Sequence, residues 1–438
     1  MRYYMQFYKV IFFIFFISHI NAAYCQSETP IFPFTFRPIT PGPVALSLGG
    51  SSIVHMDDPF FAIQNPAKLP LTTSPQFTLG LYNAILKEIS HLDNHRFSGT
   101  EGANVSEFKV NYLGFSCPFQ LFSINMAAAI SYYPLYSFER SISFQQNDEN
   151  AMTDQRQWDI NQDGYMSAIS IAYGIQFHPD WSFGFSLNFF QDDLFDNQLK
   201  QEVLMQGYRK ALIQFDEYYR QSLSHEYSGS NLNLGLMWQI SSRLKAGAVF
   251  QTRRENKISS KITETHGFNG NHPDSNIIIS DSDNLEIPMS WGIGLSYSLI
   301  DNWKLLMDFR QISWEKLRYT NSAETTQYIS GSTEGFQDLN VHMIHFGSVY
   351  QSKHAIGFFF PVFRMGFSYC TDRGMIHPEP DTTIGFGLGL VGKNLDFNIG
   401  YQYQRYEDIT QETAQAGTLR DRIRNNVIGM SLTYRIKK

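Results

Sequence analysis

The sequence predicts an all-β, transmembrane antiparallel β-barrel of about 14 strands, with an N-terminal hatch (plug) and a short helical external loop. Three observations predict this class. The chain begins with an apolar export signal, aromatic residues make up 15% of its 438 residues, and the mean hydropathy is only −0.26. Outer-membrane barrels place apolar residues at alternate positions, so high aromatic content coexists with a hydropathy typical of soluble proteins.

Residues 1–25 have the layout of a secretory signal peptide. Arg2 and Lys9 supply positive charge, the apolar run Val10 to Ile17 follows, and the expected cleavage lies between Cys25 and Gln26. That run is shorter than the ~20 residues a transmembrane helix needs. We therefore expect export, and the strand pattern below makes the cell outer membrane the expected destination.

Charge and cysteine content exclude several classes. The formal net charge is −7, and removal of the two basic signal residues gives −7 − 2 = −9, which argues against nucleic acid as a partner. Only Cys117 and Cys370 clearly remain in the mature chain, too few for a disulfide framework. One bridge or two free thiols are both compatible with the sequence.

Period-two alternation predicts the strands of a barrel over residues 75–438. In Asn394 to Gln404, for example, Leu395, Phe397 and Ile399 alternate with polar residues or glycine. The other face is polar, as expected for a wet lumen. The predicted strands are 75–84, 106–117, 121–138, 164–178, 181–192, 229–241, 243–254, 288–300, 303–314, 341–351, 362–372, 382–392, 394–404 and 426–437. Short links such as Ser241-Ser242 predict tight turns.

In the link 193–226 the apolar residues do not alternate as they do in the predicted strands. Leu204, Tyr208, Leu212 and Phe215 follow helical spacing, and no proline interrupts the segment. The sequence therefore predicts one or two amphipathic helices on an external loop. Their apolar face is a candidate capture groove for a hydrophobic ligand, and the alternative is simple packing against a neighbouring loop.

The segment 26–74 precedes the first strand and lacks alternation. Its central part, "GGSSIVHMDDPFFAIQNPAKLP", runs from Gly49 to Pro70. Glycines permit positive φ and close packing, and the residue before a proline is held extended. The residues of note are Gly49, Gly50, Asp57, Asp58, Asn65, Pro66 and Ala67. We expect this segment to fill the lumen rather than to pair as a strand.

These residues carry a resemblance to the FadL/TodX family of outer-membrane hydrophobic-compound transporters. The order of Gly-rich start, acidic pair and Asn-Pro-Ala signature is similar, and later segments agree in order. They are "DWSFGFSLNFF", "RLKAGAVFQTRRE", "DNWKLLMDFRQISWEKL", "EGFQDLNVHMIHFGSVYQ" and "FRMGFSYCTD". The likeness spans nearly the whole mature chain, although Asp58-Pro59-Phe60-Phe61 departs from the smaller residues usual after the acidic pair.

The resemblance implies passive uptake of hydrophobic molecules such as long-chain fatty acids or aromatic compounds. It places the N-terminal end toward the ligand, so Phe34, Phe36 and Arg37 become candidates for the ligand path. It also implies a kinked wall strand, which makes Pro134 the candidate for a lateral opening. The alternatives are a strand that simply ends at Pro134 and a plug that only stabilises the barrel.

The expected fold is also compatible with a function other than transport. PorV-like relatives share the expected fold, so an outer-membrane component of a type IX-like protein secretion system, with secretion-machinery proteins as partners, is the alternative. No trustworthy nucleophile, phosphate loop or carboxylate pair indicates an enzyme, and no cofactor or metal is expected. Asp159, Asn161, Asp163 and Gly164 begin like a calcium loop, but Ser170 replaces the final glutamate, which favours a turn. The expected partners are hydrophobic small molecules and outer-membrane lipid.

Overall fold

Strand pairing closes most of the chain into a ring. The computed structural model describes residues 37–436 except for 56–59, 94–97, 149–153, 192–196, 211–213, 269–275, 321–325, 329–339, 372–380 and 414–416. The signal-peptide prediction (1–25) and the candidates Phe34, Phe36, Asp57, Asp58 and Leu212 lie outside the described residues.

Fourteen antiparallel strands of the described chain form the closed barrel, as predicted. They are β2 (Gln76–Asp93), β3 (Ser98–Leu121), β4 (Ile124–Ser137), β6 (Asp154–His178), β7 (Trp181–Phe190), β9 (Gln214–Gln239), β10 (Leu244–Gln251), β13 (Ser290–Ile300), β14 (Trp303–Ser313), β17 (Asn340–Gln351), β18 (Phe360–Cys370), β19 (Asp381–Val391), β20 (Leu395–Thr413) and β21 (Gly417–Arg435). Strand β2 pairs with both β3 and β21, so no edge is left at the closure.

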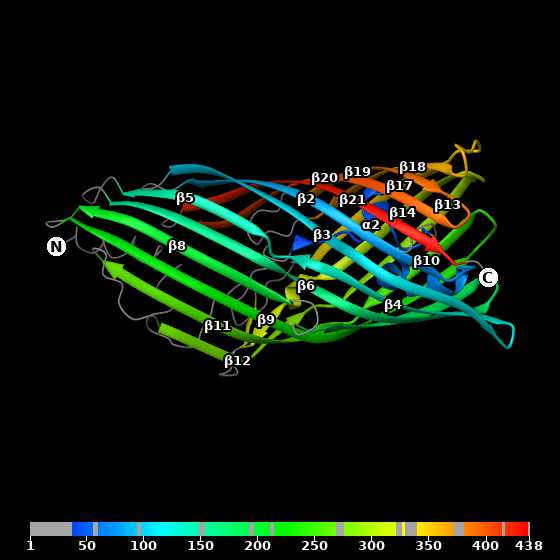
Figure 1. Cartoon of the computed structure of the whole chain (residues 1–438), viewed down its shortest axis with the longest axis horizontal. Helices are drawn as coiled ribbons and strands as arrows, with labels where there is room; N and C mark the ends of the chain where they lie inside the picture. The colour runs from blue at the N-terminus through cyan, green and yellow to red at the C-terminus, as the bar shows by residue number, and fades with distance from the viewer. Residues whose placement is uncertain are drawn as a thin grey trace.

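Further strands lengthen one end of the barrel, which we call the outer end (Figure 1). They are β5 (Arg140–Asp148), β8 (Gln198–Lys210), β11 (Arg254–Phe268), β12 (Asn276–Ile287), β15 (Arg318–Thr320) and β16 (Thr326–Tyr328). The pairings β5–β6–β8–β9–β11–β12–β15–β16 build one outer sheet. The other end, where the C-terminus lies, is the turn end, and its links are short (Figure 1).

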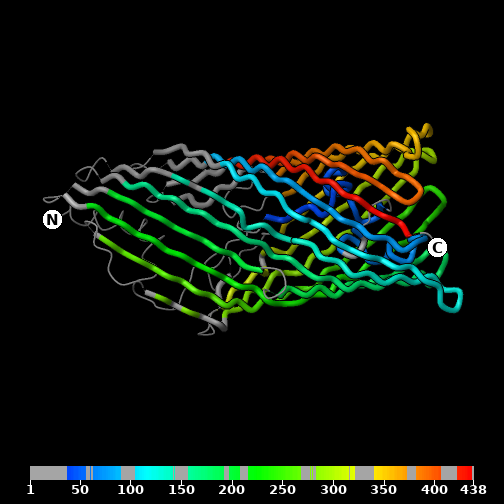
Figure 2. The backbone as a smooth tube through the Cα atoms, in the orientation of Figure 1, coloured from blue at the N-terminus to red at the C-terminus, as the bar shows by residue number. Residues whose placement is uncertain are grey.

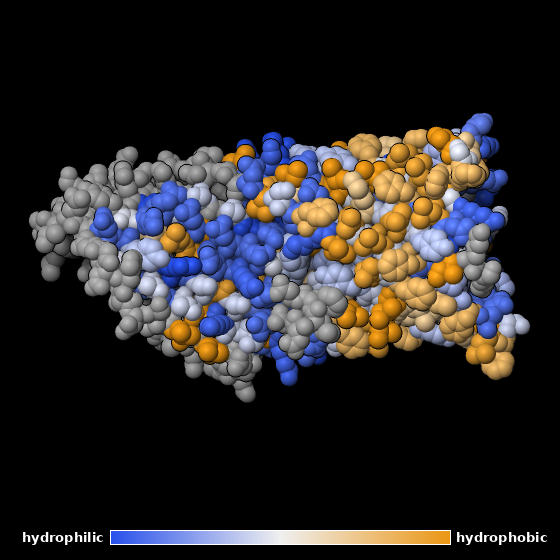
Figure 3. Space-filling view, viewed as in Figure 1, coloured by the Kyte–Doolittle hydropathy of each residue, from blue (hydrophilic) through white to orange (hydrophobic). Residues whose placement is uncertain are grey.

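Outward-facing side chains separate a lipid-facing band from the outer extension. Apolar residues gather over the half nearest the turn end, and hydrophilic residues cover the outer half (Figure 3). On β13, Trp291, Ile293, Leu295 and Tyr297 are exposed at alternate positions. On β11 the outward positions instead carry residues such as Glu255, Lys257 and Lys261. An apolar band of this kind is the surface that a barrel presents to hydrocarbon.

The link 193–226 contradicts the helical prediction. Strand β8 and the first part of β9 pair from Gln198↔Glu226 to Lys210↔Gln214, so the segment is a long β-hairpin. Val203, Met205 and Tyr219 are buried together with Trp158 on one face of this sheet. The prediction of a helical external loop over 193–226 is therefore wrong.

The calcium-like segment is also part of a strand rather than a turn. Residues Asp159 to Gly164 lie within β6 and pair with β8, from Asp159↔Leu204 to Gly164↔Leu199. Among the residues that the structure describes, no cluster of three or more His, Cys, Asp or Glu side chains is arranged to hold a metal ion. No described helix is long and apolar enough to cross a membrane.

The segment ahead of the barrel folds into short elements inside the ring of strands (Figure 2). They are β1 (Arg37–Pro38), α2 (Gly42–Ser47), α3 (Phe61–Gln64) and the 3-10 helix η2 (Pro66–Leu71). Helix α2 contacts β18, β19, β20, β21 and β2, whereas η2 contacts β4, β6, β7 and β9. We call residues 37–71 the inner segment. It therefore reaches both sides of the lumen.

Candidate functional site

Glycines on the barrel wall receive the main chain of the inner segment. A Cβ added to Gly366 would lie 2.0 Å from the carbonyl carbon of Leu48, and one added to Gly400 would lie 2.0 Å from the Pro43 carbonyl oxygen. On the opposite wall, a Cβ at Gly184 would lie 2.4 Å from Pro66. At these three positions the wall has room for the main chain of the inner segment only because no side chain is present.

Asn65 fixes the second half of the inner segment. Its side-chain oxygen accepts a hydrogen bond from the Ala67 amide at 3.1 Å and caps η2, as an N-cap asparagine does. Its amide nitrogen donates to the carbonyl oxygens of Ile53 (3.0 Å) and Leu236 (3.3 Å). Pro66 occupies the first position of η2, and the Ala67 carbonyl accepts a bond from Ser182 at 2.7 Å.

Gly49 and Gly50 form a turn that barrel side chains hold. Both have positive φ, 62° and 95°, which favours glycine. A ring nitrogen of His345 (Nδ1) lies 2.7 Å from the Gly49 carbonyl oxygen. Asp308 accepts hydrogen bonds from the amides of Ser52 (2.6 Å) and Ile53 (2.9 Å).

Asp308 and its neighbour Arg310 were not among the predicted site residues. Arg310 donates to the Ser52 hydroxyl at 3.0 Å. The alternation of β14 places both side chains on the lumen face, opposite Met307 and Phe309. The alternation along β14 is visible in the sequence and predicts that Asp308 and Arg310 face the lumen. It does not show which groups of the inner segment these two side chains contact.

A cavity of about 270 Å³ lies beside the inner segment. Its lining includes the aromatic or apolar residues Tyr133 and Leu135 of β4, Ile312 of β14 and Trp314, which follows β14. It also includes polar residues from β17 to β20: His345, Ser368, Asp381, Thr383, Gln402 and Gln404. Tyr133, Trp314, Val341 and Cys370 of the lining also belong to a large buried cluster rich in aromatic residues, which includes Phe138, Phe190 and Tyr227.

The barrel wall has a break in pairing next to this cavity. Pairing of β3 with β4 runs from Leu121↔Ile124 to Leu113↔Tyr132 and extends no further. Pro134, which is buried, has no N–H to donate, and the β4–β6 register shifts between Pro134 and Tyr136. Beyond this point β1 takes the free edge of β4, with Arg37↔Ser137 and Pro38↔Tyr136. We call this break the seam.

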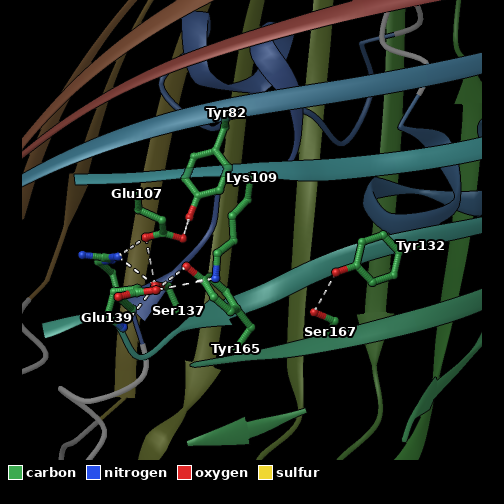
Figure 4. A network of polar contacts seen from close by, with 9 residues as sticks. Tyr82, Glu107, Lys109, Tyr132, Ser137, Glu139, Tyr165 and Ser167 are labelled. Atoms are coloured by element: carbon green, nitrogen blue, oxygen red, sulfur yellow. Dashed lines mark hydrogen bonds and ion pairs between the residues drawn. The ribbon is translucent and has the colours of Figure 1, made fainter. Parts of the chain in front are cut away.

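Side-chain ion pairs cross the seam (Figure 4). Arg37 donates to Glu107 at 2.7 Å and to Ser137 at 2.8 Å, and Tyr82 also donates to Glu107. Lys109 lies 3.6 Å from Glu139, which also accepts a hydrogen bond from the Tyr165 hydroxyl at 2.8 Å.

Farther toward the outer end, Arg140 pairs with the buried Glu88. Over this stretch, ion pairs replace main-chain hydrogen bonds between the β2–β3 side and the β4–β5 side.

The remaining predicted candidates do not form one site. Leu204 and Tyr208 lie on β8 and Phe215 on β9, at the outer end, so the expected helical face is absent. Arg37 lies at the seam, and Pro134 is part of it. Cys117 and Cys370 are both free cysteines, which settles the thiol alternative in favour of two unbridged residues.

Comparison with known proteins fits this architecture. A family profile for BamG matches residues 43–435, nearly the whole described chain. The chain belongs to the BamG family. No curated protein matches it by sequence.

Solved structures similar to this BamG-family chain are barrels of the expected kind. The toluene transporter TodX of P. putida has a TM-score of 0.60 at 13% identity, over 91% of this chain and 99% of that one. A Pseudomonas aeruginosa FadL homologue has a TM-score of 0.62 at 11% identity, over 92% and 100%. The toluene transporter TbuX of Ralstonia pickettii gives 0.54 at 14% identity, over 90% and 98%. At these identities the likeness establishes the fold.

Proposed function

We propose that this protein is an outer-membrane channel for passive uptake of hydrophobic small molecules, with residues 26–74 as its hatch. The observation that carries the proposal is that the cavity and the seam share Tyr133, Leu135 and Tyr136. A molecule in the cavity is therefore next to the one stretch of described wall where β3 and β4 are unpaired. The neighbours with this fold are described as toluene transporters and a FadL homologue, which are not enzymes.

The seam is proposed as a lateral exit that Pro134 helps to create. On its β2–β3 side the outward residues Ile85, Phe108 and Val110 are exposed, so the break opens toward an apolar surface. An apolar solute leaving there avoids crossing the hatch. In this account Arg37 is part of the ligand path because its ion pair with Glu107 closes the seam, and Phe34 and Phe36 precede it in the chain.

Proteoliposome uptake tests the channel and the exit separately. Labelled toluene and a labelled long-chain fatty acid are offered to liposomes with and without the protein, and saturable uptake of either is expected. For the exit, Lys109→Cys and Glu139→Cys are joined across the seam by a short bis-maleimide, in a chain whose native cysteines are replaced by alanine. We expect uptake to fall at least tenfold on cross-linking.

The matched control joins Phe115→Cys to Ile130→Cys. These residues are opposite partners where β3 and β4 already pair, and both face outward. This cross-link should leave uptake unchanged. An uptake rate that the seam cross-link leaves unchanged would contradict the lateral exit. Uptake of both compounds no faster than into empty liposomes would contradict the channel function. The secretion-component alternative stays a prediction, which no described contact favours.

A further inference from the structure

Polar side chains form a row across four neighbouring strands of the cavity wall. His345 on β17 lies opposite Ser368 on β18, Ser368 lies opposite Thr383 on β19, and Thr383 lies opposite Gln404 on β20. All four residues line the cavity. Gln402 also lines it, and lies two positions from Gln404 on the same face of β20. The cavity that we propose for hydrophobic solutes therefore has a substantial polar part.

Three hydrogen-bond acceptors of the lining are buried and have no partner among the described residues. They are Nε2 of His345, Oε1 of Gln402 and Oδ1 of Asn233. The exposed fractions of these residues are 7%, 6% and 8%, and each residue lies on a different strand, β17, β20 and β9. A buried acceptor that lacks a hydrogen is unfavourable, so a ligand that fills the cavity should supply hydrogens to these atoms.

The contact with the inner segment determines which ring nitrogen of His345 carries the hydrogen. Nδ1 lies 2.7 Å from the Gly49 carbonyl oxygen, and a carbonyl oxygen only accepts. Nδ1 is therefore the donor, and in the neutral ring Nε2 is left as an acceptor. The contact that holds the Gly49–Gly50 turn thus also sets the hydrogen-bonding character of His345 toward the cavity.

Side-chain donors of the lining do not balance these acceptors. Arg310 donates to the Ser52 hydroxyl at 3.0 Å, and Gln404 donates to Asp381 at 2.8 Å. In the described part of the lining, no side-chain nitrogen that bears a hydrogen is buried without a partner. The unpaired buried groups are therefore acceptors, and they call for a ligand that donates.

The size and the remaining lining of the cavity suit an aromatic ligand. The volume of about 270 Å³ is roughly nine times the ~30 Å³ that one water occupies in the liquid, so it holds on the order of ten non-hydrogen atoms. That space suits a single benzene ring with small substituents. Tyr133, Trp314 and Met343 line the same cavity and offer aromatic and apolar contacts to such a ring.

We propose that this cavity selects small aromatic compounds that carry hydroxyl groups. The ring packs against Tyr133 and Trp314, and the hydroxyl hydrogens go to acceptors among His345, Gln402 and Asn233. This inference rests on the proposed channel function and narrows its substrate class. A hydrocarbon of the same size fills the cavity but leaves the buried acceptors without hydrogens, and a methyl ether does the same although it contains oxygen.

Calorimetric titration of the full chain in nanodiscs of neutral phosphatidylcholine tests the proposal, with empty nanodiscs as the blank for partitioning into lipid. The probes are toluene, para-methylanisole, para-cresol and para-hydroxybenzyl alcohol. Titration at about pH 8 keeps phenols and imidazoles of ordinary pKa neutral. We expect para-cresol to bind at least threefold more tightly than para-methylanisole, and para-hydroxybenzyl alcohol to bind more tightly than para-cresol, because each added donor forms a further hydrogen bond.

Two variants remove acceptors one at a time. His345→Asn retains an amide donor close to the position of Nδ1, for the Gly49 carbonyl, and removes Nε2. Gln402→Met removes the amide and keeps a side chain of similar length. Each variant should weaken para-hydroxybenzyl alcohol 3- to 10-fold and change toluene less than twofold. Gln120→Met is the matched control, because Gln120 is an exposed residue that pairs with Asn125 at the β3–β4 turn, and it should change no affinity.

The proposal is overturned if para-cresol binds the native chain no more tightly than para-methylanisole. It is also overturned if Gln402→Met and a folded His345→Asn leave the affinity of para-hydroxybenzyl alcohol unchanged, or weaken toluene equally. Uptake of toluene and para-cresol into proteoliposomes is measured separately. If both enter and the hydroxyl group gives no gain in affinity, the channel function survives and only the selectivity fails. If neither enters faster than into empty liposomes while the affinities follow the expected order, the channel function fails and the binding site stands.

Discussion

Replacing Asp308 by asparagine should loosen the inner segment without unfolding the barrel. Asp308 is 1% exposed and accepts the amide hydrogens of both Ser52 and Ile53. A hydrogen bond to a charged group contributes about 1.5–3 kcal/mol, so the two bonds together contribute about 3–6 kcal/mol. Asparagine keeps one side-chain acceptor and loses the charge, so we expect a loss of about half, roughly 1.5–3 kcal/mol.

Amide hydrogen exchange resolved by mass spectrometry measures this loss. A local change of about 1.5–3 kcal/mol should speed exchange of peptides covering residues 48–55 by about 10- to 150-fold, since ~1.4 kcal/mol corresponds to tenfold. Peptides from β18 to β21 should not change, because their ladders do not depend on Asp308. Asp301→Asn is the matched control, since Asp301 is an exposed carboxylate on the same hairpin. Unchanged exchange of residues 48–55 would refute the conclusion that Asp308 holds the inner segment in place.

Three other predictions follow from packing, the seam and burial. Gly366→Ala places a methyl group against the Leu48 main chain, so we expect the variant to melt at least 5 °C lower, and an unchanged melting temperature would contradict the tight fit. Glu107→Gln removes the partner of Arg37, so toluene uptake into proteoliposomes should rise, and equal uptake would exclude this ion pair as the closure of the seam. His225, in the outer extension, has its pKa lowered to about 4 because burial disfavours the imidazolium. Its contribution of about 3 kcal/mol is present above pH 6.5 and is lost as pH falls toward 4, so exchange of β9 and β11 amides should accelerate over that range in the native chain and not in His225→Gln.

The fold was predictable where the bilayer imposes a pattern. Each of the fourteen predicted strands overlaps one barrel strand, because lipid on one side and a polar lumen on the other enforce alternation, as in Leu395, Phe397 and Ile399. The predicted turn at Ser241-Ser242 is confirmed between β9 and β10. The barrel therefore followed from residues alone.

The outer extension was not predictable in the same way. Above the lipid-facing band no hydrocarbon requires apolar residues on the outward face of a strand, so the outward apolar alternation that reveals the barrel strands is absent there. In β8 the buried residues Leu199, Val203 and Met205 do alternate, but Leu204 and Tyr208 also match a helix. Pairing with distant β6 and β9 decides the outcome, and no local pattern contains that information.

Only part of the candidate site could be predicted from the sequence, for a related reason. Gly49, Gly50 and Asn65 were noticed because turn and cap chemistry is local. Asp308 and the seam depend on which lumen positions meet across the barrel. The Pro134 candidate was found by the missing N–H of proline, whereas the replacement of β3 by β1 at that edge has no sequence signature.

The glycine-lined contacts also constrain the order in which the molecule assembles. The main chain of the inner segment lies against Gly366 and Gly400 on one wall and Gly184 on the other, so a closed barrel leaves no space through which this segment could enter. The ring is completed only when the last strand, β21, joins the first, β2. We therefore expect the inner segment to fold first and the barrel strands to assemble around it. The hydrogen bonds between β21 and β2 would then form last.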